Sequence, residues 1–433
     1  MLTDTAYDPS RILERLGGIP VAIAEAALYV SETGCDEASY IRMFDEEWCS
    51  FVASNEASGH WLLDYHGSMT AVWTKIFQAI QAEDGAAARL LLFWSRIDHS
   101  DLWFDLLRST NLSESRWPWF KDLASSEVKF LSVMRLLLRY SIVEKHAHGY
   151  YMHPLVHRWL SHLPGDSEIA DYQQLALSAI GQVTPPNVSR DFWSKQMRLM
   201  PHANRCAASL KRGVSPQEYD AVVVSSIHLL GDLSLDQGLL DQAEFLYRHA
   251  LERCKALFDP YDLRTLVIMK SLANACSRLA RPGAERLYRL TLEACEGTLG
   301  TGHPLTLEVV NDLASLCVDQ NRLQEAETLF DWALEGKKLI LGPDDPSTLN
   351  TMSSLANAYA QKVHVQDDAG EVEEREEAEQ RYLQAIAGLM KALGLEHPFT
   401  LNALSNLGLL YARIGRLEDA EAFSINTNAT LPH

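Results

Sequence analysis

The segment TLEVVNDLASLCVDQNRLQEAETLFDWALEGKKLILG, residues 306–342, shows most directly how this chain folds. Apolar residues recur at three- and four-residue intervals in its first half, and the same spacing returns after a polar link. That spacing is typical of amphipathic helices that bury one face. The apolar residues are Leu307, Val310, Leu313, Ala314, Leu316 and Cys317, then Leu323, Ala326, Leu329, Phe330 and Ala333. We therefore predict two helices joined by a turn at 319–322.

The same pattern recurs on both sides of this segment. Three series of residues keep one register: Ala-Glu pairs that begin at Ala243, Ala284, Ala326, Ala378 and Ala420, Thr-Leu pairs that begin at Thr265, Thr306, Thr348 and Thr400, and Leu272, Leu313, Leu355 and Leu407. The steps are 41, 42 and 52 residues, and the long step indicates an insertion of ten residues at the acidic stretch 367–379. Such a period indicates stacked repeats. We predict five helix pairs over residues 222–423.

These units resemble the tetratricopeptide repeat (TPR), in the 42-residue form found in kinesin light chains. The matching residues are Gly238-Leu239-x-x-x-Ala243-Glu244-x-x-Tyr247-x-x-Ala250-Leu251 and Arg322-Leu323-x-x-Ala326-Glu327-x-x-Phe330-x-x-Ala333-Leu334. The resemblance implies an α-solenoid over 221–433 whose inner groove binds a protein or an extended peptide. The end of the sequence, SINTNATLPH at 424–433, departs from the family, which would continue an amphipathic helix there.

Polar residues close to the repeated leucines are the candidate peptide-binding residues, because amide side chains near these positions often serve this purpose in the family. They are Lys270, Asn274, Asn311, Ser315, Asn357 and Asn406. The alternative, that they are ordinary solvated helix positions, is equally open. His303 and His397 each precede a proline, and we interpret them as residues that begin helices rather than as metal ligands.

The first half of the chain contains two short motifs and no repeat. Gly17 and Gly18 precede Pro20, which predicts a tight corner before a helix. A β-hairpin between 141–143 and 149–151 is predicted to lead into Met152-His153-Pro154. His153 and His157 lie four residues apart, but the Glu of a His-Glu-x-x-His motif and a third ligand are both missing, so we predict no metal site.

Together these motifs resemble the ARC part of NB-ARC nucleotide-binding switches, including fungal receptors that combine it with TPRs. The resemblance implies an ARC-like helical subdomain at 8–65, a winged-helix-like subdomain at 66–165 and a helical connector at 166–220. It also implies that Pro20 contacts adenine and that His153 contacts the β-phosphate of ADP. Pro154 stands where the family has aspartate. The predicted fold class is mainly α, with these two subdomains followed by the TPR solenoid.

The phosphate loop of that family is missing from the sequence. The family places it well over a hundred residues before the Gly-x-Pro motif, and only 16 residues precede Gly17. A Gly-x-x-x-x-Gly-Lys-Ser/Thr motif does not occur, and Gly336-Lys337-Lys338 is predicted to lie inside a repeat helix. We therefore predict a chain that is not an enzyme and needs no cofactor. ADP or ATP would bind only with a nucleotide-binding domain supplied elsewhere.

Composition limits the classes of partner and the cellular compartment that we expect for this protein. A net charge of −20 repels nucleic acid. A basic leader and an apolar run long enough to span a membrane are both absent from the sequence, which predicts a soluble, cytoplasmic protein without a membrane partner. Cys254 and Cys295 are 41 residues apart, as are Cys276 and Cys317, which indicates buried, reduced thiols in successive repeats.

The predicted function is that of a non-catalytic or truncated NB-ARC–TPR signalling protein, receptor-like, whose groove binds a protein or peptide. One alternative is a stand-alone TPR scaffold or adaptor of the kinesin-light-chain type. Another is a fragment of an ATP- or ADP-dependent STAND switch, the wider class of NB-ARC proteins. An in-frame phosphate loop upstream in the gene would favour the last alternative.

Overall fold

The computed structural model describes most of the chain after residue 68. The described ranges are 69–108, 116–163, 165–185, 192–213, 219–362 and 371–420, with isolated positions between 23 and 42. Pro20 and most of the predicted ARC-like subdomain lie outside these ranges. The fold is mainly α, as predicted, and divides into two compact units. Unit 1 comprises Met1–Val183 and Arg198–Ser226, and unit 2 comprises Thr184–Met197 and Ile227–His433.

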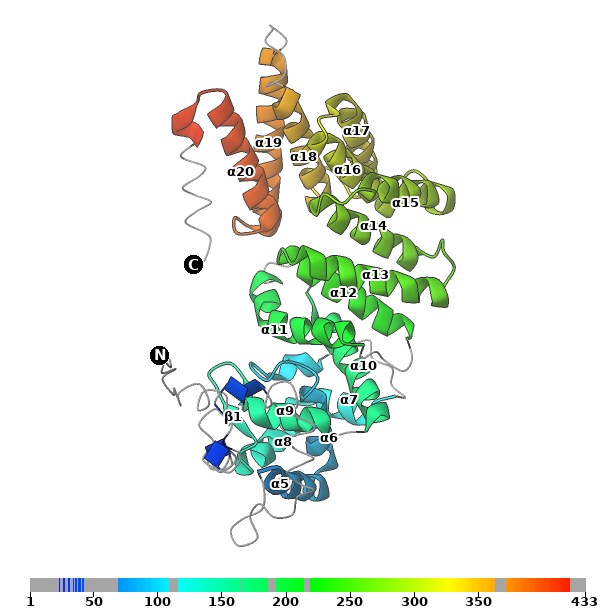
Figure 1. Cartoon of the computed structure of the whole chain (residues 1–433). Coiled ribbons are helices and arrows are strands. Elements are labelled where there is room, and N and C mark those ends of the chain that lie inside the picture. The colour runs from blue at the N-terminus through cyan, green and yellow to red at the C-terminus, as the bar shows by residue number, and fades with distance from the viewer. Residues whose placement is uncertain are drawn as a thin grey trace, which may run out of the picture. The chain divides into compact units, whose positions relative to one another are not determined.

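Unit 1 surrounds a short hairpin with helices (Figure 1). Its elements are α5 (Met69–Glu83), α6 (Gly85–Trp94), the 3-10 helix η1 (Phe104–Leu107), α7 (Pro118–Ala124), α8 (Glu127–Arg139), β1 (Val143–Lys145), β2 (Tyr150–Met152), α9 (Pro154–His162), α10 (Asp166–Val183) and most of α11 (Phe192–Lys211). Buried rings form its core, with Phe93 edge-on to Phe120 and Trp94 edge-on to Phe130.

The predicted hairpin is present. Its strands are antiparallel, and Glu144 pairs with Tyr151 in their register. The first strand begins two residues later than predicted, at Val143. The reason is Ser141, whose φ of 55° places it in the left-handed region, so that it forms the turn after α8 instead of extending into the strand.

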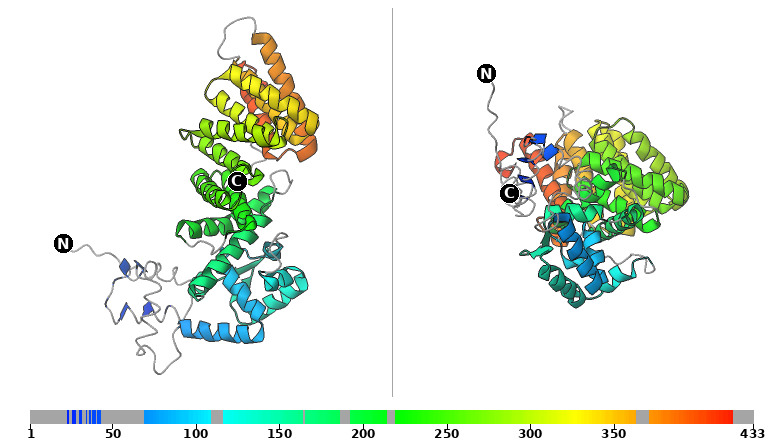
Figure 2. Two further views of the ribbon diagram at one scale, coloured as in Figure 1. Left: turned by 90° about the vertical axis from the view of Figure 1, so that its right-hand side faces the viewer. Right: turned by 60° about the horizontal axis from the view of Figure 1, so that its bottom comes forward.

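Unit 2 is a stack of antiparallel helix pairs, which confirms the helical repeats (Figures 1 and 2). Its helices are the later part of α12 (Ala221–Asp236), α13 (Leu240–Leu257), α14 (Leu263–Arg278), α15 (Ala284–Leu299), α16 (Pro304–Asp319), α17 (Leu323–Ile340), α18 (Pro346–Lys362), α19 (Glu371–Leu393) and α20 (Pro398–Arg413). Residues 417–420 are also helical. The predicted departure at 424–433 lies outside the described residues.

The four turns inside helix pairs that the structure describes share one backbone conformation. A residue with positive φ ends the first helix at Gly238 (75°), Ala280 (51°), Asn321 (59°) and Gly415 (78°), all in the register of the repeat. The next N–H then bonds back to the carbonyl five residues earlier, as from Arg322 to Cys317 at 2.8 Å. This closure satisfies carbonyls that the helix end would otherwise leave exposed. It therefore fixes where the second helix begins.

Small side chains allow the helices of unit 2 to lie close together. Ala243, Ala326 and Ala378, from the repeated Ala-Glu pairs, are fully buried. The four cysteines at the repeated spacing are also buried and free, as predicted: Cys254, Cys276, Cys295 and Cys317. Among the described helices, none is long and apolar enough to cross a membrane.

A test of close helix packing is available in unit 1, where α10 crosses the first turns of α12. A Cβ atom on Gly181 would lie 2.6 Å from both the Cα and the backbone oxygen of Ser226. Because the backbone of Ser226 cannot move away as a flexible side chain could, Gly181→Ala is expected to lower the free energy of unfolding by about 1–3 kcal/mol. Urea denaturation followed by circular dichroism measures the loss.

Gly297 is the matched control, since it is also a helical glycine but has no neighbour within 4 Å of an added Cβ. Gly297→Ala should raise stability by about 0.5–1 kcal/mol through helix propensity alone. If both variants shifted the denaturation midpoint in the same direction, the close crossing at Gly181 would be wrong.

Candidate peptide-binding face of the repeats

The six candidate residues all lie on the first helices of the pairs. Lys270 and Asn274 are on α14, Asn311 and Ser315 on α16, Asn357 on α18, and Asn406 on α20. Their positions relative to the repeated leucine form two rows. Asn274, Ser315 and Asn357 come two residues after it, while Lys270 and Asn311 come two residues before it. Asn406 belongs to neither row, because it precedes Leu407 by one residue.

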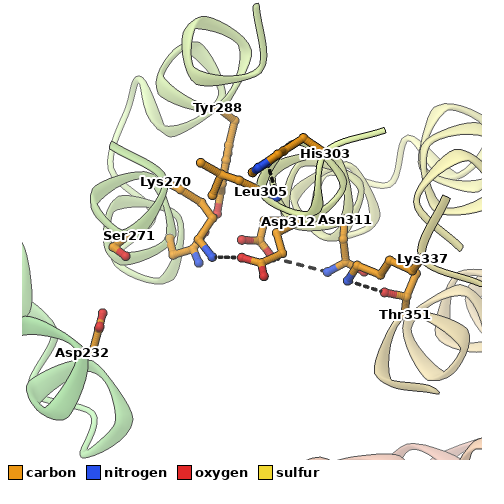
Figure 3. A network of polar contacts seen from close by, with 12 residues as sticks. Asp232, Lys270, Ser271, Tyr288, His303, Leu305, Asn311, Asp312, Lys337 and Thr351 are labelled. Carbon is orange, nitrogen blue, oxygen red and sulfur yellow. Dashed lines mark hydrogen bonds and ion pairs between the residues drawn. The ribbon is translucent and has the colours of Figure 1, made fainter. Parts of the chain in front are cut away.

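An ion pair links the first two of these helices. The Lys270 Nζ atom contacts the Glu308 carboxylate of α16. Burial lowers the pKa of Lys270, but the negative charges of Glu308 and Asp312 outweigh this effect and raise it. Burial also raises the pKa of Asp312, and Lys270 partly offsets the rise. Figure 3 shows Lys270 pointing toward the carboxylates of α16.

A second lysine enters the same cluster from α17. Lys337 is 3% exposed, and its Nζ donates a hydrogen bond to Thr351 Oγ1 of α18 at 2.9 Å (Figure 3). Burial lowers the pKa of Lys337, while Glu308 and Asp312 oppose that shift. We did not assign Glu308, Asp312 or Lys337 to the site from the sequence. The burial of Lys337 was predictable, because this residue follows Ala333 by one helical turn on the buried side of α17.

Two further candidates, Asn274 and Ser315, make hydrogen bonds within the array. Asn274 Oδ1 accepts a 2.6 Å hydrogen bond from the Tyr288 hydroxyl of α15, so this amide holds the two helices of one pair together. Ser315 Oγ donates to the Asn311 carbonyl in its own helix at 3.1 Å. The structure therefore gives both side chains an internal role that needs no ligand.

Asn311 differs from these two. Its side chain is nearly buried, with 8% of the residue exposed, and Nδ2 makes a 3.3 Å contact to Asp312 Oδ1. Its Oδ1 atom is buried and has no hydrogen-bond partner among the described residues. Leaving such an acceptor unpaired costs about 1–3 kcal/mol. Asn357 and Asn406 are half-buried, and their side chains make no hydrogen bond to the described part of the chain.

The histidines that precede prolines share one role. His303 Nδ1 accepts from the Leu305 N–H and His397 Nδ1 from the Phe399 N–H, each at 3.2 Å, which caps α16 and α20 as predicted. His153 Nδ1 caps α9 in the same way, through Leu155 N–H at 3.2 Å. Its contact with a nucleotide stays a prediction, as does that of Pro20, which the structure does not describe. In the described ranges, no three His, Cys, Asp or Glu side chains gather as metal ligands.

His157 has a separate role, although it lies one helical turn after His153. Its ring is buried in unit 1, where Nε2 lies 2.8 Å from the Ile97 carbonyl and 3.2 Å from that of Trp94. These distances suit an N–H that donates to both oxygens. His157 therefore ties α9 to the end of α6.

The glutamates of the repeated Ala-Glu pairs link neighbouring repeats. Four of the five contact a cation near the turn of the following unit: Glu244 with Arg281, Glu285 with Arg322, Glu327 with Lys362, and Glu379 with Arg416. We assigned these glutamates no role from the sequence. The ion pairs with arginine were predictable from the sequence, because each of the three arginines follows its glutamate by 37 residues.

Comparison with known proteins confirms the repeats. The tetratricopeptide repeat family matches residues 282–338 and 371–424. No curated protein gives a significant sequence match. The match does not reach the first half of the chain, where the likeness to NB-ARC proteins stays a prediction.

Several solved structures are similar to this chain at low identity. A putative kinesin light chain with nearly identical TPR-like repeats from Podosopora anserina is 22% identical over 48% of this chain and 94% of its own, with a TM-score of 0.36. BtubC from P. vanneervenii is 22% identical over 54% and 90%, with a TM-score of 0.40. A STAND protein with a tetratricopeptide repeat sensor from Pyrococcus horikoshii is 12% identical over 94% and 65%, with a TM-score of 0.27.

Proposed function

We propose that this chain is a protein-interaction scaffold without catalytic activity, and that its repeats bind an extended segment of a partner protein. TPR arrays expose a long surface formed by successive first helices, which suits an extended ligand better than a compact one. The tetratricopeptide repeat match supports this class of function. The resemblance of the first half to NB-ARC–TPR receptors supports a signalling role for the scaffold.

The observation that carries the proposal is the unpaired Oδ1 atom of Asn311. A backbone N–H of a bound peptide would supply the missing donor, and the N–H of Nδ2 that does not contact Asp312 would be available to a peptide carbonyl. Asn357, on the next first helix, presents a second amide for the same purpose. Because an extended peptide offers donors and acceptors at regular intervals, amides on successive repeats can contact successive residues of one ligand.

Replacing both asparagines should weaken peptide binding clearly. Each amide-to-backbone hydrogen bond contributes about 0.5–1.5 kcal/mol, so Asn311→Ala/Asn357→Ala should raise the dissociation constant by roughly 5- to 150-fold. The probe is a peptide selected from a random phage-displayed library on the full chain. Its affinity is then measured by fluorescence anisotropy.

Gln324→Ala is the matched control, because Gln324 is an exposed amide on a second helix, α17. This variant should bind the selected peptide as the unchanged chain does. Equal affinity of the double variant and the unchanged chain would show that the peptide does not use these amides. A selection that enriches no peptide would count against the groove itself.

A further inference from the structure

Unit 1 contains a cavity of about 650 Å³ among α6, α9, α10 and α11. This volume lies within the range of small-molecule sites, roughly 300–1,000 Å³. Its described lining includes no carboxylate but four arginines: Arg96, Arg158, Arg205 and Arg212. A chain with a net charge of −20 thus places a group of positive charges around one cavity.

Two of these arginines, Arg96 and Arg205, have no counter-ion among the described residues. Arg96 is 8% exposed, and its guanidinium donates hydrogen bonds to neutral oxygens, Ser95 Oγ at 3.1 Å and the Ser161 carbonyl at 2.6 Å. Burial, and then the charge of Arg205, lowers the pKa of Arg96 to about 10. Neither arginine forms an ion pair within the described ranges. Both causes disfavour the charged guanidinium, and no carboxylate contributes to offset them.

Arg205 is a second buried guanidinium whose pKa is lowered. Burial lowers its pKa, and the positive charge of Arg212 adds to the effect, while Asp98 acts in the opposite direction. The Asp98 carboxylate is already engaged, because it accepts hydrogen bonds from the backbone N–H of Ser100, at 2.9 Å, and from the Ser100 hydroxyl. This engaged carboxylate does not neutralise both Arg96 and Arg205.

Gln173 of α10 adds an unpaired donor to the wall of the cavity. The residue is 1% exposed, and its Oε1 accepts a 2.9 Å hydrogen bond from Ser209 Oγ of α11. Its Nε2 is buried and has no hydrogen-bond partner among the described residues. A buried N–H₂ group without an acceptor is unfavourable, because it has given up its hydrogen bonds to water. A ligand that enters this cavity must therefore offer acceptors as well as negative charge.

We propose that this cavity binds a small molecule through a phosphate group, which Arg96 and Arg205 hold by their guanidinium groups and Gln173 holds by Nε2. Phosphate carries up to two negative charges and several acceptor oxygens, and guanidinium groups bind it in a bidentate manner. The carboxylate of an ordinary metabolite carries one charge and offers two oxygens, which leaves part of this donor set unused. The site does not involve the candidate peptide-binding residues of unit 2.

Inorganic pyrophosphate is the probe, titrated into the full chain by isothermal calorimetry at physiological ionic strength. We expect saturable binding at one site. Arg205→Gln should weaken it by about tenfold or more, because a hydrogen bond to a charged group contributes about 1.5–3 kcal/mol. Gln173→Leu, which keeps the volume but removes the donor, should weaken it severalfold. Absence of binding to the unchanged chain would overturn the proposal.

Arg135→Gln is the matched control, since it removes the same charge from an exposed position on α8. If this variant weakened pyrophosphate binding as much as Arg205→Gln, general attraction would explain the result and the site would be refuted. Citrate, a tricarboxylate, tests the chemical class, and tighter binding of citrate than of pyrophosphate would overturn the assignment to phosphate.

A measurement on the unchanged chain keeps the proposal testable if a variant fails to fold. Pyrophosphate should slow hydrogen exchange of backbone amides in α9 and α10, which contribute Arg158 and Gln173 to the cavity. Exchange in α17, in unit 2, should stay the same and serves as the internal reference. Equal slowing in both places, or none in α9 and α10, contradicts binding in this cavity.

Discussion

Replacing Phe330 with alanine is expected to lower the free energy of unfolding of the repeats by about 3–5 kcal/mol. The ring lies on α17, is 1% exposed and belongs to the hydrophobic core that runs from α14 to α20. Its removal loses buried apolar area and leaves a cavity that the close-packed helices around it cannot fill. Urea denaturation followed by circular dichroism gives the change in midpoint and slope.

Leu339→Ala provides the comparison on the same helix. Leu339 is 88% exposed, so truncation removes a large apolar side chain without opening a cavity, and stability should change by no more than about 0.5 kcal/mol. A loss as large as that of Phe330→Ala would mean that α17 presents a different face to the core.

Unit 1 is expected to lose about 5 kcal/mol of stability when the pH falls from 7.5 to 4.5, owing to two buried histidines. Burial lowers the pKa of His157 to about 4, with a further contribution from Arg205, and burial lowers that of His202 to about 4. Both rings thus stay neutral in the folded chain, whereas unfolded histidine takes up its proton near pH 6.5. The stability is complete above pH 6.5 and is lost as the pH falls toward 4.

Urea denaturation at a series of pH values, followed by tryptophan fluorescence, measures this loss. His202→Gln keeps a side-chain N–H that can donate to the Asp101 carbonyl, the partner of His202 Nε2 at 3.2 Å, but it cannot titrate. Its pH dependence should be weaker by about half. His146→Gln removes an exposed ring from the same unit, and its profile should match that of the unchanged chain. If the profile of His202→Gln also matched that of the unchanged chain, protonation of His202 would not explain the loss of stability.

The repeats could be predicted from sequence because their signals are local and recur. Apolar spacing, small residues and the register of Leu313 with its counterparts each depend on positions a few residues apart. The roles of individual polar residues could not be predicted in this way. Asn274 pairs with Tyr288 from another helix, and the cavity around Arg205 forms only when four helices come together. Such contacts depend on tertiary packing.

The His-Pro dipeptides show how a resemblance can obscure a local signal. The sequence contains this dipeptide at His153, His303 and His397. We interpreted the last two as helix starts, and treated the first as a nucleotide contact because of the likeness to NB-ARC proteins. The structure gives all three the same Nδ1 cap. The geometry of the cap was therefore predictable at His153 as well, whatever further contact its ring makes.

The ion pairs between neighbouring repeats have a mechanical consequence. Each of the four glutamates contacts a cation of the unit that follows it, so these links stand in series along the array. A tension applied between the ends of a series is the same at every link, and extension begins where a link is weakest. Under a pulling force, the interfaces between repeats would therefore separate one at a time, the weakest first, and the array would lengthen in discrete steps. Salt screens exposed ion pairs, so the load needed for the first steps should fall as ionic strength rises.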